Sequence, residues 1–244
     1  MPTASATQTP GAKMQFLIKR RSSASREELI SHWFGNHMPR VMERSENDRA
    51  EGRLHPTRYW VSLFDAAGNG AQPWDGVAQL WFPEQPPWPE QASGVVPADS
   101  FHEKAEPYWP WATSEWVAID GQVPTELSKV GPPYPCTRSG FVKQVSLVAA
   151  RPGVDLAAMH RHWLDAHIPN VVETMNKVGG FRYVVSLSMD EGRAPYAGMA
   201  ELYFPDADAQ KAFWSAIKPD GFQNFSDPEN TVRFNCGTEM VGIA

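Results

Sequence analysis

The sequence predicts an α+β fold in which two ferredoxin-like βαββαβ repeats pack sheet to sheet as an intramolecular dimeric α+β barrel. Three observations lead to this prediction. Four blocks of sequence occur twice in the same order, strand-like and helix-like segments alternate around them, and a proline-rich stretch separates the two halves. A four-stranded sheet with both helices on one side leaves its other face uncovered, and a second such sheet can cover it.

The firmest of the repeated blocks is a helix motif. Residues 32–39 read HWFGNHMP and residues 162–169 read HWLDAHIP, an offset of 162 − 32 = 130. The other pairs are RYWVSL at 58–63 with RYVVSL at 182–187, GVAQLWFP at 76–83 with GMAELYFP at 198–205, and EWVAI at 115–119 with EMVGI at 239–243. Their offsets are 182 − 58 = 124, 198 − 76 = 122 and 239 − 115 = 124, so only small insertions separate them. This shared order predicts an internal duplication.

The repeat boundaries follow from these blocks and from composition. Residues 1–12, rich in Ser, Thr and Pro, are expected to form a disordered tail, and residues 13–122 the first repeat. Residues 123–140 contain four prolines and are expected to be a linker, after which residues 141–244 form the second repeat.

Each repeat begins with a strand followed by a helix. The β-rich runs at 14–20 and 141–149 predict the first strands. Ser25 and Asp155 are residue types that cap helix N-termini, so the first helices are expected to start there. They are expected to end near Arg44 and near Lys177, where two glycines follow.

The remaining elements differ between the two halves at one place. The RYxVSL, GxAxLxFP and ExVxI blocks predict the second, third and fourth strands of each repeat. Residues 206–217 carry apolar side chains at helical spacing and predict a second helix. The corresponding segment at 84–105 contains four prolines and is expected to be a loop, with at most one late helical turn.

Composition excludes several classes of protein. The net charge is −6, and Lys and Arg are scattered, so no basic face for nucleic acid is expected. No apolar run is long enough for a membrane span and no secretory signal precedes the first repeat, which predicts a cytoplasmic protein. Cys136 and Cys236 lack the spacing of a zinc site or a disulfide framework.

The duplicated helix motif carries a resemblance to a known family. A first strand, a helix ending in Trp-x-x-x-His-x-Pro and an aromatic second strand resemble the EthD-like family, which belongs to the dimeric α+β barrel superfamily. The resemblance covers residues 14–120 and again 141–244. It implies a binding cavity between helices and sheet. Members include cofactor-independent decarboxylases, cyclases and isomerases, often acting on aromatic or polyketide compounds.

Two histidines are the leading catalytic candidates. His37 and His167 end the motif, four residues after Trp33 and Trp163, so each imidazole shares a helix face with an indole. A histidine can take and return a proton near neutral pH, which suits a general acid/base. The alternative is that each imidazole only anchors its helix, and the sequence favours neither interpretation. We rank His167 first and His37 close behind.

Aromatic residues supply the remaining candidates. Tyr59 and Tyr183, on the second strands, could donate a proton or hold a phenolate. The candidates for substrate binding are Trp33, Trp163, Trp60, Trp81, Tyr203 and His102. For the strand aromatics, simple burial in the core is the more frequent role. No ligand triad of recognisable spacing appears, so no metal and no cofactor are expected.

Together these observations predict a cofactor-independent lyase or isomerase that acts on a small hydrophobic molecule, with aromatic compounds favoured, and that uses a helix histidine as general acid/base. Two alternatives stay open: a non-catalytic binding or accessory protein of aromatic catabolism and, less favoured, a haem-binding protein. The expected partners are the small substrate and, for a homodimer, a second copy of the chain, but neither nucleic acid nor a membrane.

Overall fold

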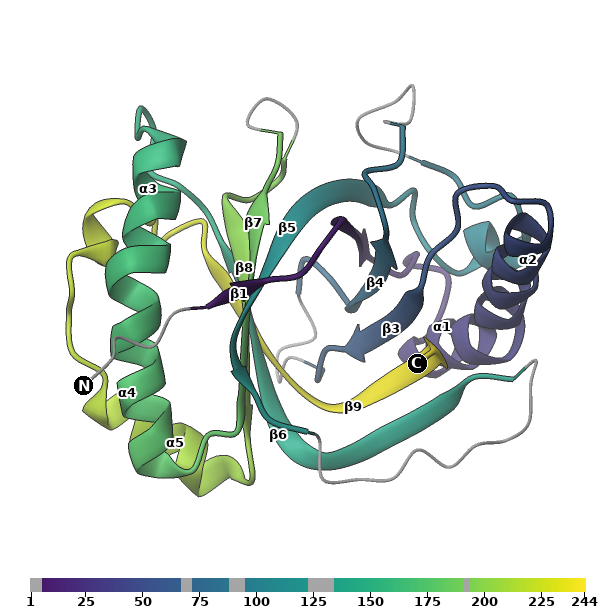
Figure 1. The fold of residues 1–244 in the computed structure, drawn as a ribbon. Helices are drawn as coiled ribbons and strands as arrows, with labels where there is room; N and C mark the ends of the chain where they lie inside the picture. Colours follow the sequence, from purple (N-terminus) through teal and green to yellow (C-terminus); the bar gives the residue numbers. More distant parts are fainter. Residues whose placement is uncertain (1–5, 67–71, 88–94, 123–133, 191–193) are drawn as a thin grey trace. The chain divides into compact units, whose positions relative to one another are not determined.

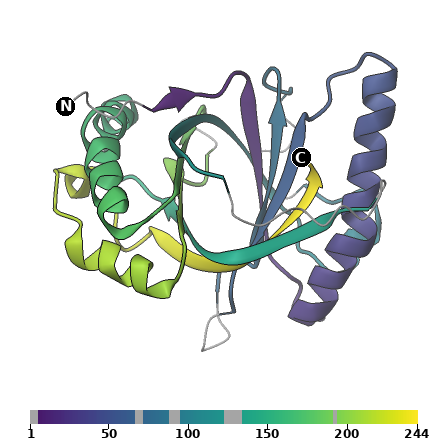
Figure 2. The same ribbon diagram turned by 60° about the horizontal axis from the view of Figure 1, so that its bottom comes forward.

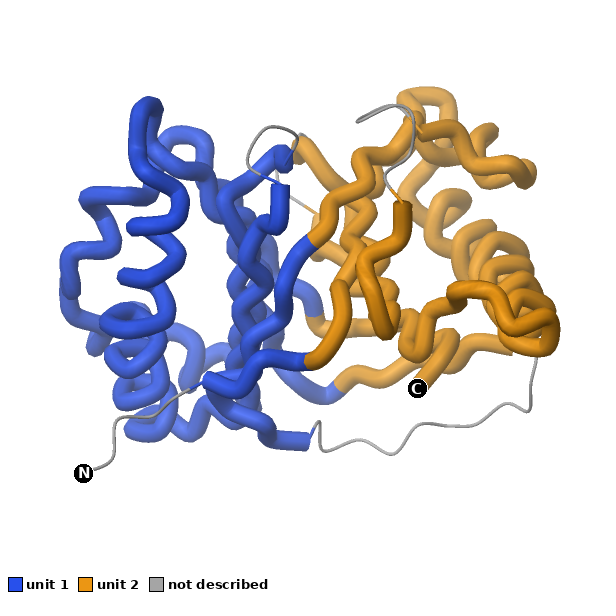
Figure 3. Tube along the Cα trace, turned by 45° about the horizontal axis from the view of Figure 1, so that its top comes forward, with its two compact units in different colours: residues 1–9, 113–124, 140–236 blue, residues 10–112, 125–139, 237–244 orange. Residues whose placement is uncertain are grey.

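The computed structural model describes residues 6–66, 72–87, 95–122, 134–190 and 194–244. The chain divides into two compact units (Figure 3). Unit 1 contains residues 1–9, 113–124 and 140–236, and unit 2 contains residues 10–112, 125–139 and 237–244. Each unit is therefore built mainly from one half of the sequence and completed by segments of the other half.

Unit 2 holds the first copy of the helix motif. Its elements are β2 (Ala12–Ile18), α1 (Arg26–His32), a π-helical turn (Trp33–His37), α2 (Met38–Ala50), β3 (Arg58–Leu63), β4 (Gly76–Phe82) and a 3₁₀ turn (Ser100–Glu103). Strand β4 pairs antiparallel with β2 and β3, and β3 pairs with the last residues of β9 (Val232–Ile243). The helices lie against one face of this sheet (Figures 1 and 2).

Unit 1 holds the second copy. Its elements are β1 (Thr7–Gln8), most of β5 (Trp109–Asp120) and β6 (Cys136–Val148), α3 (Leu156–His162), a π-helical turn (Trp163–His167), α4 (Ile168–Val178), β7 (Arg182–Ser188), β8 (Gly198–Phe204), α5 (Ala207–Ala216) and a 3₁₀ turn (Phe222–Asn224). Strand β8 pairs with β6 and β7, and β5 pairs with β7 and β1. Helices α3, α4 and α5 cover one face of the sheet (Figure 1).

The predicted α+β class is confirmed, with antiparallel strands and helices that pack on them. The ferredoxin-like detail, the sheet-to-sheet barrel and the repeat boundaries stay predictions. Residues 1–5 of the expected tail and 123–133 of the expected linker lie outside the described residues. Within the tail, Thr7 and Gln8 pair with β5, so this part is ordered.

The first helices begin where the sequence predicts. Ser25 caps α1 in a capping box, because its hydroxyl accepts from the Glu28 N–H at 3.1 Å and its own N–H donates to the Glu28 carboxylate at 2.7 Å. Asp155 caps α3 by accepting from the N–H groups of Ala157 and Ala158. Both arrangements satisfy amide groups that a helix start leaves unpaired.

A glycine lets each helix approach its sheet. A Cβ added at Gly76 would lie 2.7 Å from the Ser62 carbonyl oxygen and 3.2 Å from the Trp33 ring. A Cβ added at Gly198 would likewise lie 2.8 Å from the Ser186 carbonyl oxygen and 2.8 Å from the Trp163 ring. The repeated third-strand block begins with glycine because the motif tryptophan packs directly on the strand backbone. No helix among the described residues has the length and hydropathy needed to cross a membrane.

Candidate functional site

Each motif helix widens into one π-helical turn between its tryptophan and its histidine. The Met38 N–H donates to the Trp33 carbonyl five residues back, and the Ile168 N–H donates to the Trp163 carbonyl in the same way. The next residue is proline in both cases, which has no N–H to donate and whose ring would clash with the carbonyl four residues earlier. The wider turn relieves that clash, and such turns occur frequently at functional sites.

The turn in unit 2 presents His37 to an aspartate and a phenylalanine. Its Nδ1 lies 2.7 Å from Asp99 Oδ2, and its ring stacks on Phe101 with centroids 4.4 Å apart. Asp99 is itself fixed, because its Oδ1 accepts from the Phe101 N–H at 2.9 Å and caps the 3₁₀ turn. We call these three residues the His37 cluster.

The same arrangement recurs in unit 1. His167 Nδ1 lies 2.7 Å from Asp220 Oδ2, and the imidazole stacks on Phe222 at 4.3 Å. Asp220 accepts from the Phe222 N–H at 3.0 Å and also from the Asn170 side-chain amide at 2.7 Å. We call His167, Asp220 and Phe222 the His167 cluster.

The electrostatics of the clusters follow from burial and pairing. Burial lowers the pKa of His37 below its ordinary value, because a charged ring loses hydration, and the hydrogen bond to Asp99 opposes this only in part. Burial alone would raise the pKa of Asp99 and Asp220, but hydrogen bonds from the histidines and from backbone amides outweigh it and hold each pKa below its usual range. His37 is therefore neutral near pH 7, with its Nδ1 proton directed at Asp99.

The two tyrosine candidates are fully buried beneath the tryptophans. The Trp33 indole N–H donates to the Tyr59 hydroxyl at 3.3 Å, and the Trp163 indole donates to the Tyr183 hydroxyl at 3.4 Å. Burial raises the pKa of both phenols far above their ordinary value. Each phenol thus remains protonated and can donate a hydrogen bond.

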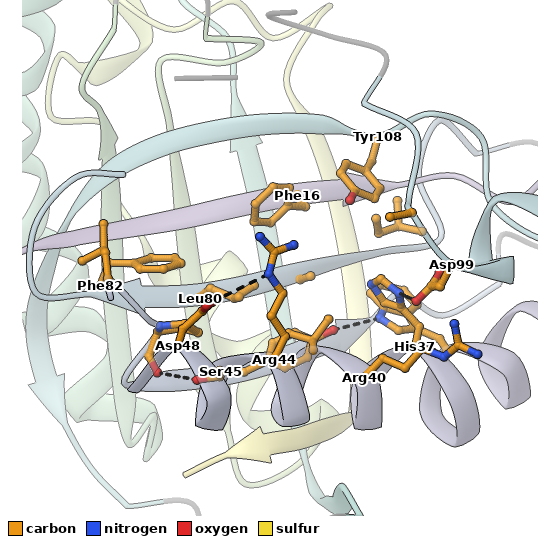
Figure 4. A pocket seen from close by; sticks show the side chains of 18 residues that line it. Phe16, His37, Arg40, Arg44, Ser45, Asp48, Leu80, Phe82, Asp99 and Tyr108 are labelled. Carbon is orange, nitrogen blue, oxygen red and sulfur yellow. Dashed lines mark hydrogen bonds and ion pairs between the residues drawn. The ribbon is translucent and has the colours of Figure 1, made fainter. Parts of the chain in front are cut away.

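A large cavity in unit 2 opens beside the His37 cluster. It has a volume of about 490 Å³ and lies between α2 and the strands β2, β3 and β4 (Figure 4). Trp33, His37, Tyr59 and Asp99 contribute to its wall. The apolar lining includes Phe16, Ile18, Val41, Leu80 and Phe82, and the charged lining consists of Arg40, Arg44, Asp48 and Asp99.

The corresponding cavity in unit 1 is much smaller. It measures about 130 Å³ and is lined by Trp163, His167 and Tyr183. Phe213, Trp214 and Ile217, all from α5 or its end, also form its wall. Within the described part of unit 2, the segment that follows β4 forms a 3₁₀ turn and no α-helix. Among the described residues, α5 thus lines the second cavity, and no α-helix takes the equivalent place beside the first.

The other predicted substrate-binding residues lie apart from both cavities. Trp60 and Trp81 contact one another with ring centroids 5.0 Å apart, and Tyr203 packs against Phe141 and Phe181. His102 is exposed and its Nδ1 lies 2.6 Å from the Asp99 carbonyl oxygen. None of these four lines either cavity described above, and their role in binding stays a prediction.

Sequence reasoning missed the acidic partners of the histidines. Asp99-Ser100-Phe101 and Asp220-Gly221-Phe222 share the pattern Asp-x-Phe at an offset of 220 − 99 = 121, close to the 122 and 124 of the neighbouring blocks. That register could have revealed them, although the prolines before Asp99 make its segment look unrelated to the one before Asp220.

Comparison with known proteins gives a family match for part of the chain and a set of similar structures. A family model described as the EthD domain matches residues 151–229. No curated protein sequence matches significantly. A solved structure of a haem-binding protein from Thermus thermophilus is similar at 11% identity and a TM-score of 0.41, covering 98% of this chain and 94% of that one. A chlorite dismutase from Candidatus Nitrospira defluvii is similar at 7% identity and a TM-score of 0.45, covering 93% and 91%.

These comparisons correct the predicted function. The matched structures carry the names of a haem-binding protein and of chlorite dismutases, including a putative one at 11% identity and a TM-score of 0.43. The similarity to a haem-binding protein conflicts with a cofactor-independent lyase or isomerase, so that prediction was wrong. The two alternatives, a binding protein and a haem-binding protein, remain to be argued from the residues of this chain.

Proposed function

We propose that the chain is a small-molecule-binding protein whose binding site is the cavity of unit 2. The observation that carries this proposal is the cavity of about 490 Å³ beside the His37 cluster. Its volume falls within the roughly 300–1,000 Å³ range of small-molecule sites. The wall combines many apolar side chains with a few polar groups, which is the composition of such sites.

The polar end of the cavity defines how a ligand would be oriented. Asp99 accepts a hydrogen bond from the Nδ1–H group of His37. In the neutral ring Nε2 therefore carries no proton and can accept a hydrogen bond. His37 lines the cavity, and a hydroxyl or another N–H or O–H group on the ligand would donate to it. The remainder of the ligand would be apolar, to match Phe16, Leu80 and Phe82.

The test is ligand-observed NMR with a panel of aromatic alcohols and aromatic carboxylates. Members of the panel should bind the wild-type chain. Val41→Trp, which fills the cavity from α2, should abolish this binding, whereas Glu43→Trp, on the exposed side of the same helix, should not. If no compound binds, or if Val41→Trp binds as well as the wild-type chain, the proposal fails.

We further propose that the chain arose by tandem duplication of an EthD-like unit. The family model covers only the second copy. Support for the first copy comes from features that both units share: a π-helical turn, a histidine paired with an Asp-x-Phe segment, and a glycine under the motif tryptophan.

Haem is a second candidate ligand, favoured by the pairing of His37 with Asp99. A histidine that ligates iron usually gives its other ring N–H to a carboxylate or carbonyl, and His37 has this arrangement. Arg40 and Arg44 lie on the cavity wall and could pair with propionate groups. Bound haem would supply redox and oxygen chemistry at this site. The cavity of about 130 Å³ beside His167 does not fit a porphyrin.

Titration with hemin, followed by absorbance, separates the two candidates. Haem binding through His37 predicts a Soret band that His37→Ala removes or shifts and that His167→Ala leaves unchanged. If the wild-type chain leaves the spectrum of free hemin unchanged and members of the panel bind, the apolar ligand remains as the proposed function. An identical band in both variants would exclude His37 as the iron ligand.

A further inference from the structure

The cavity of unit 2 is lined by two arginines of its motif helix, whereas the cavity of unit 1 is lined by one arginine, Arg233 of β9, and by none from its motif helix. Arg40 and Arg44 stand one turn apart on α2, three and seven residues after His37, and both line the cavity. At the offset of 130 that joins the two motif helices, their counterparts are Asn170 and Thr174. Asn170 donates to Asp220 and Thr174 donates to the Asn170 carbonyl, so neither supplies a charge.

Arg44 is placed to meet a ligand in the cavity. Figure 4 shows its guanidinium reaching from α2 across the cavity towards Phe16, on the side where Tyr108 lies. Tyr108 also lines the cavity and contacts Phe16 edge to face with ring centroids 5.4 Å apart. Burial raises the pKa of Tyr108, which keeps its hydroxyl protonated and able to donate, while Arg44 acts on this pKa in the opposite direction.

The acidic residues around the cavity already have partners. Asp48 accepts from Arg53 at 2.6 and 2.8 Å, whereas its distance to Arg44 Nε is 3.7 Å. Asp99 is held by His37 and by the Phe101 N–H at the other end of the cavity. The charge of Arg44 is thus weakly balanced, and its side chain is 83% exposed at the open side of the cavity.

We propose that the ligand of this cavity carries a carboxylate, which Arg44 binds while the apolar part of the ligand lies against Phe16 and Leu80. This inference rests on the proposed binding function and adds the chemical class of the ligand. Guanidinium groups bind carboxylates through paired N–H donors, and such charge-assisted hydrogen bonds are stronger than those between neutral groups. The hydroxyl of Tyr108 is a further donor on the same side.

The experiment compares cinnamate with cinnamamide, which have the same shape but differ in charge. Binding is measured by isothermal titration calorimetry or ligand-observed NMR at low and high salt. The wild-type chain should bind cinnamate about tenfold more tightly, the scale expected for one charge-assisted hydrogen bond, and the preference should shrink with salt. Arg44→Gln and the Arg40→Gln/Arg44→Gln double variant should lose this preference while binding cinnamamide as before.

Arg49→Gln provides the matched control. Arg49 lies on the same helix but outside the wall of this cavity, so the variant should keep the wild-type preference for cinnamate. If both compounds bind equally to every variant, the carboxylate inference is overturned and the cavity proposal stands. If neither compound binds while neutral members of the aromatic panel do, the carboxylate inference is overturned and the cavity proposal stands. If no member of the panel binds either, the proposed function itself fails.

Discussion

His37 and His167 pair with the same residue types and differ in the cavity that each of them lines. Asp99 and Asp220 each accept from Nδ1 at 2.7 Å. His37, however, lines the larger cavity and its pKa is lowered by burial. At the scale of single residues, His37 is thus the histidine whose protonation should affect both ligand and fold.

The lowered pKa of His37 predicts how stability depends on pH. In the unfolded chain the ring binds its proton below about pH 6.5, whereas the folded ring binds it only at a lower pH. Between these values the unfolded state holds more protons, so the free energy of unfolding falls as the pH drops through this window. Urea denaturation of His37→Gln between about pH 7 and pH 5 should show a shallower decline than the wild-type chain. An unchanged slope would contradict the assignment.

The mutual packing of a helix and its sheet rests on one glycine in each unit. At Gly76 an added methyl group would lie against a carbonyl and the Trp33 ring, and such overpacking costs about 1–3 kcal/mol. Gly76→Ala should therefore destabilise the chain and displace Trp33, which reduces binding in the neighbouring cavity.

Gly35→Ala is the matched test of that argument. Gly35 has no atom within 4 Å of an added Cβ and its backbone has no positive φ, so alanine should be neutral or stabilise by about 0.4–1 kcal/mol. Chemical denaturation of both variants gives the comparison. Similar losses at the two positions would mean that backbone flexibility, and not the contact with Trp33, explains the glycine.

The helix start gives a second prediction at the scale of elements. Ser25→Ala removes the hydroxyl that accepts from the Glu28 N–H and should lower the free energy of unfolding by about 1 kcal/mol. Asp155→Ala removes two such bonds at the equivalent place on α3 and should cost a similar amount. Urea denaturation of both variants measures this, and no loss in either would show that the caps are dispensable.

Helices and strands could be predicted from the sequence because their signals are local. The candidate site could not, because it depends on residues far apart in the chain. Ser25, the prolines after the histidines and the alternating RYxVSL blocks act through neighbouring backbone, so they place helices and strands directly. The π-helical turn between each motif tryptophan and its histidine was not predicted from the sequence. The pairing of His37 with Asp99 joins residues 62 positions apart through a proline-rich segment, which no periodicity reveals.

At the scale of the whole molecule, the two halves of the chain differ in the cavity beside the motif histidine. Sequence similarity placed His167 first, since its surroundings match the family pattern better, and the family model does match that half of the chain. Cavity volume points to the other half, with about 490 Å³ beside His37 and about 130 Å³ beside His167. Volume depends on which segment fills the space after the third strand, a property of packing that motif similarity does not record.

The difference in cavity volume predicts that one chain binds one ligand. It also predicts that enlarging the smaller cavity creates a second binding site. Phe213, from α5, is 2% exposed and lines the smaller cavity, so Phe213→Ala enlarges it by the volume of a phenyl ring at a cost of about 3–5 kcal/mol. Apolar cavities of that kind bind benzene.

Calorimetric titration with benzene should give one binding site per wild-type chain. In Phe213→Ala the same titration should give a second site. Trp214→Ala opens the same cavity at a residue that is 45% exposed, so it keeps the test valid should the first variant fail to fold. Two sites in the wild-type chain, or no new site in either variant, would show that α5 is not what closes the second cavity.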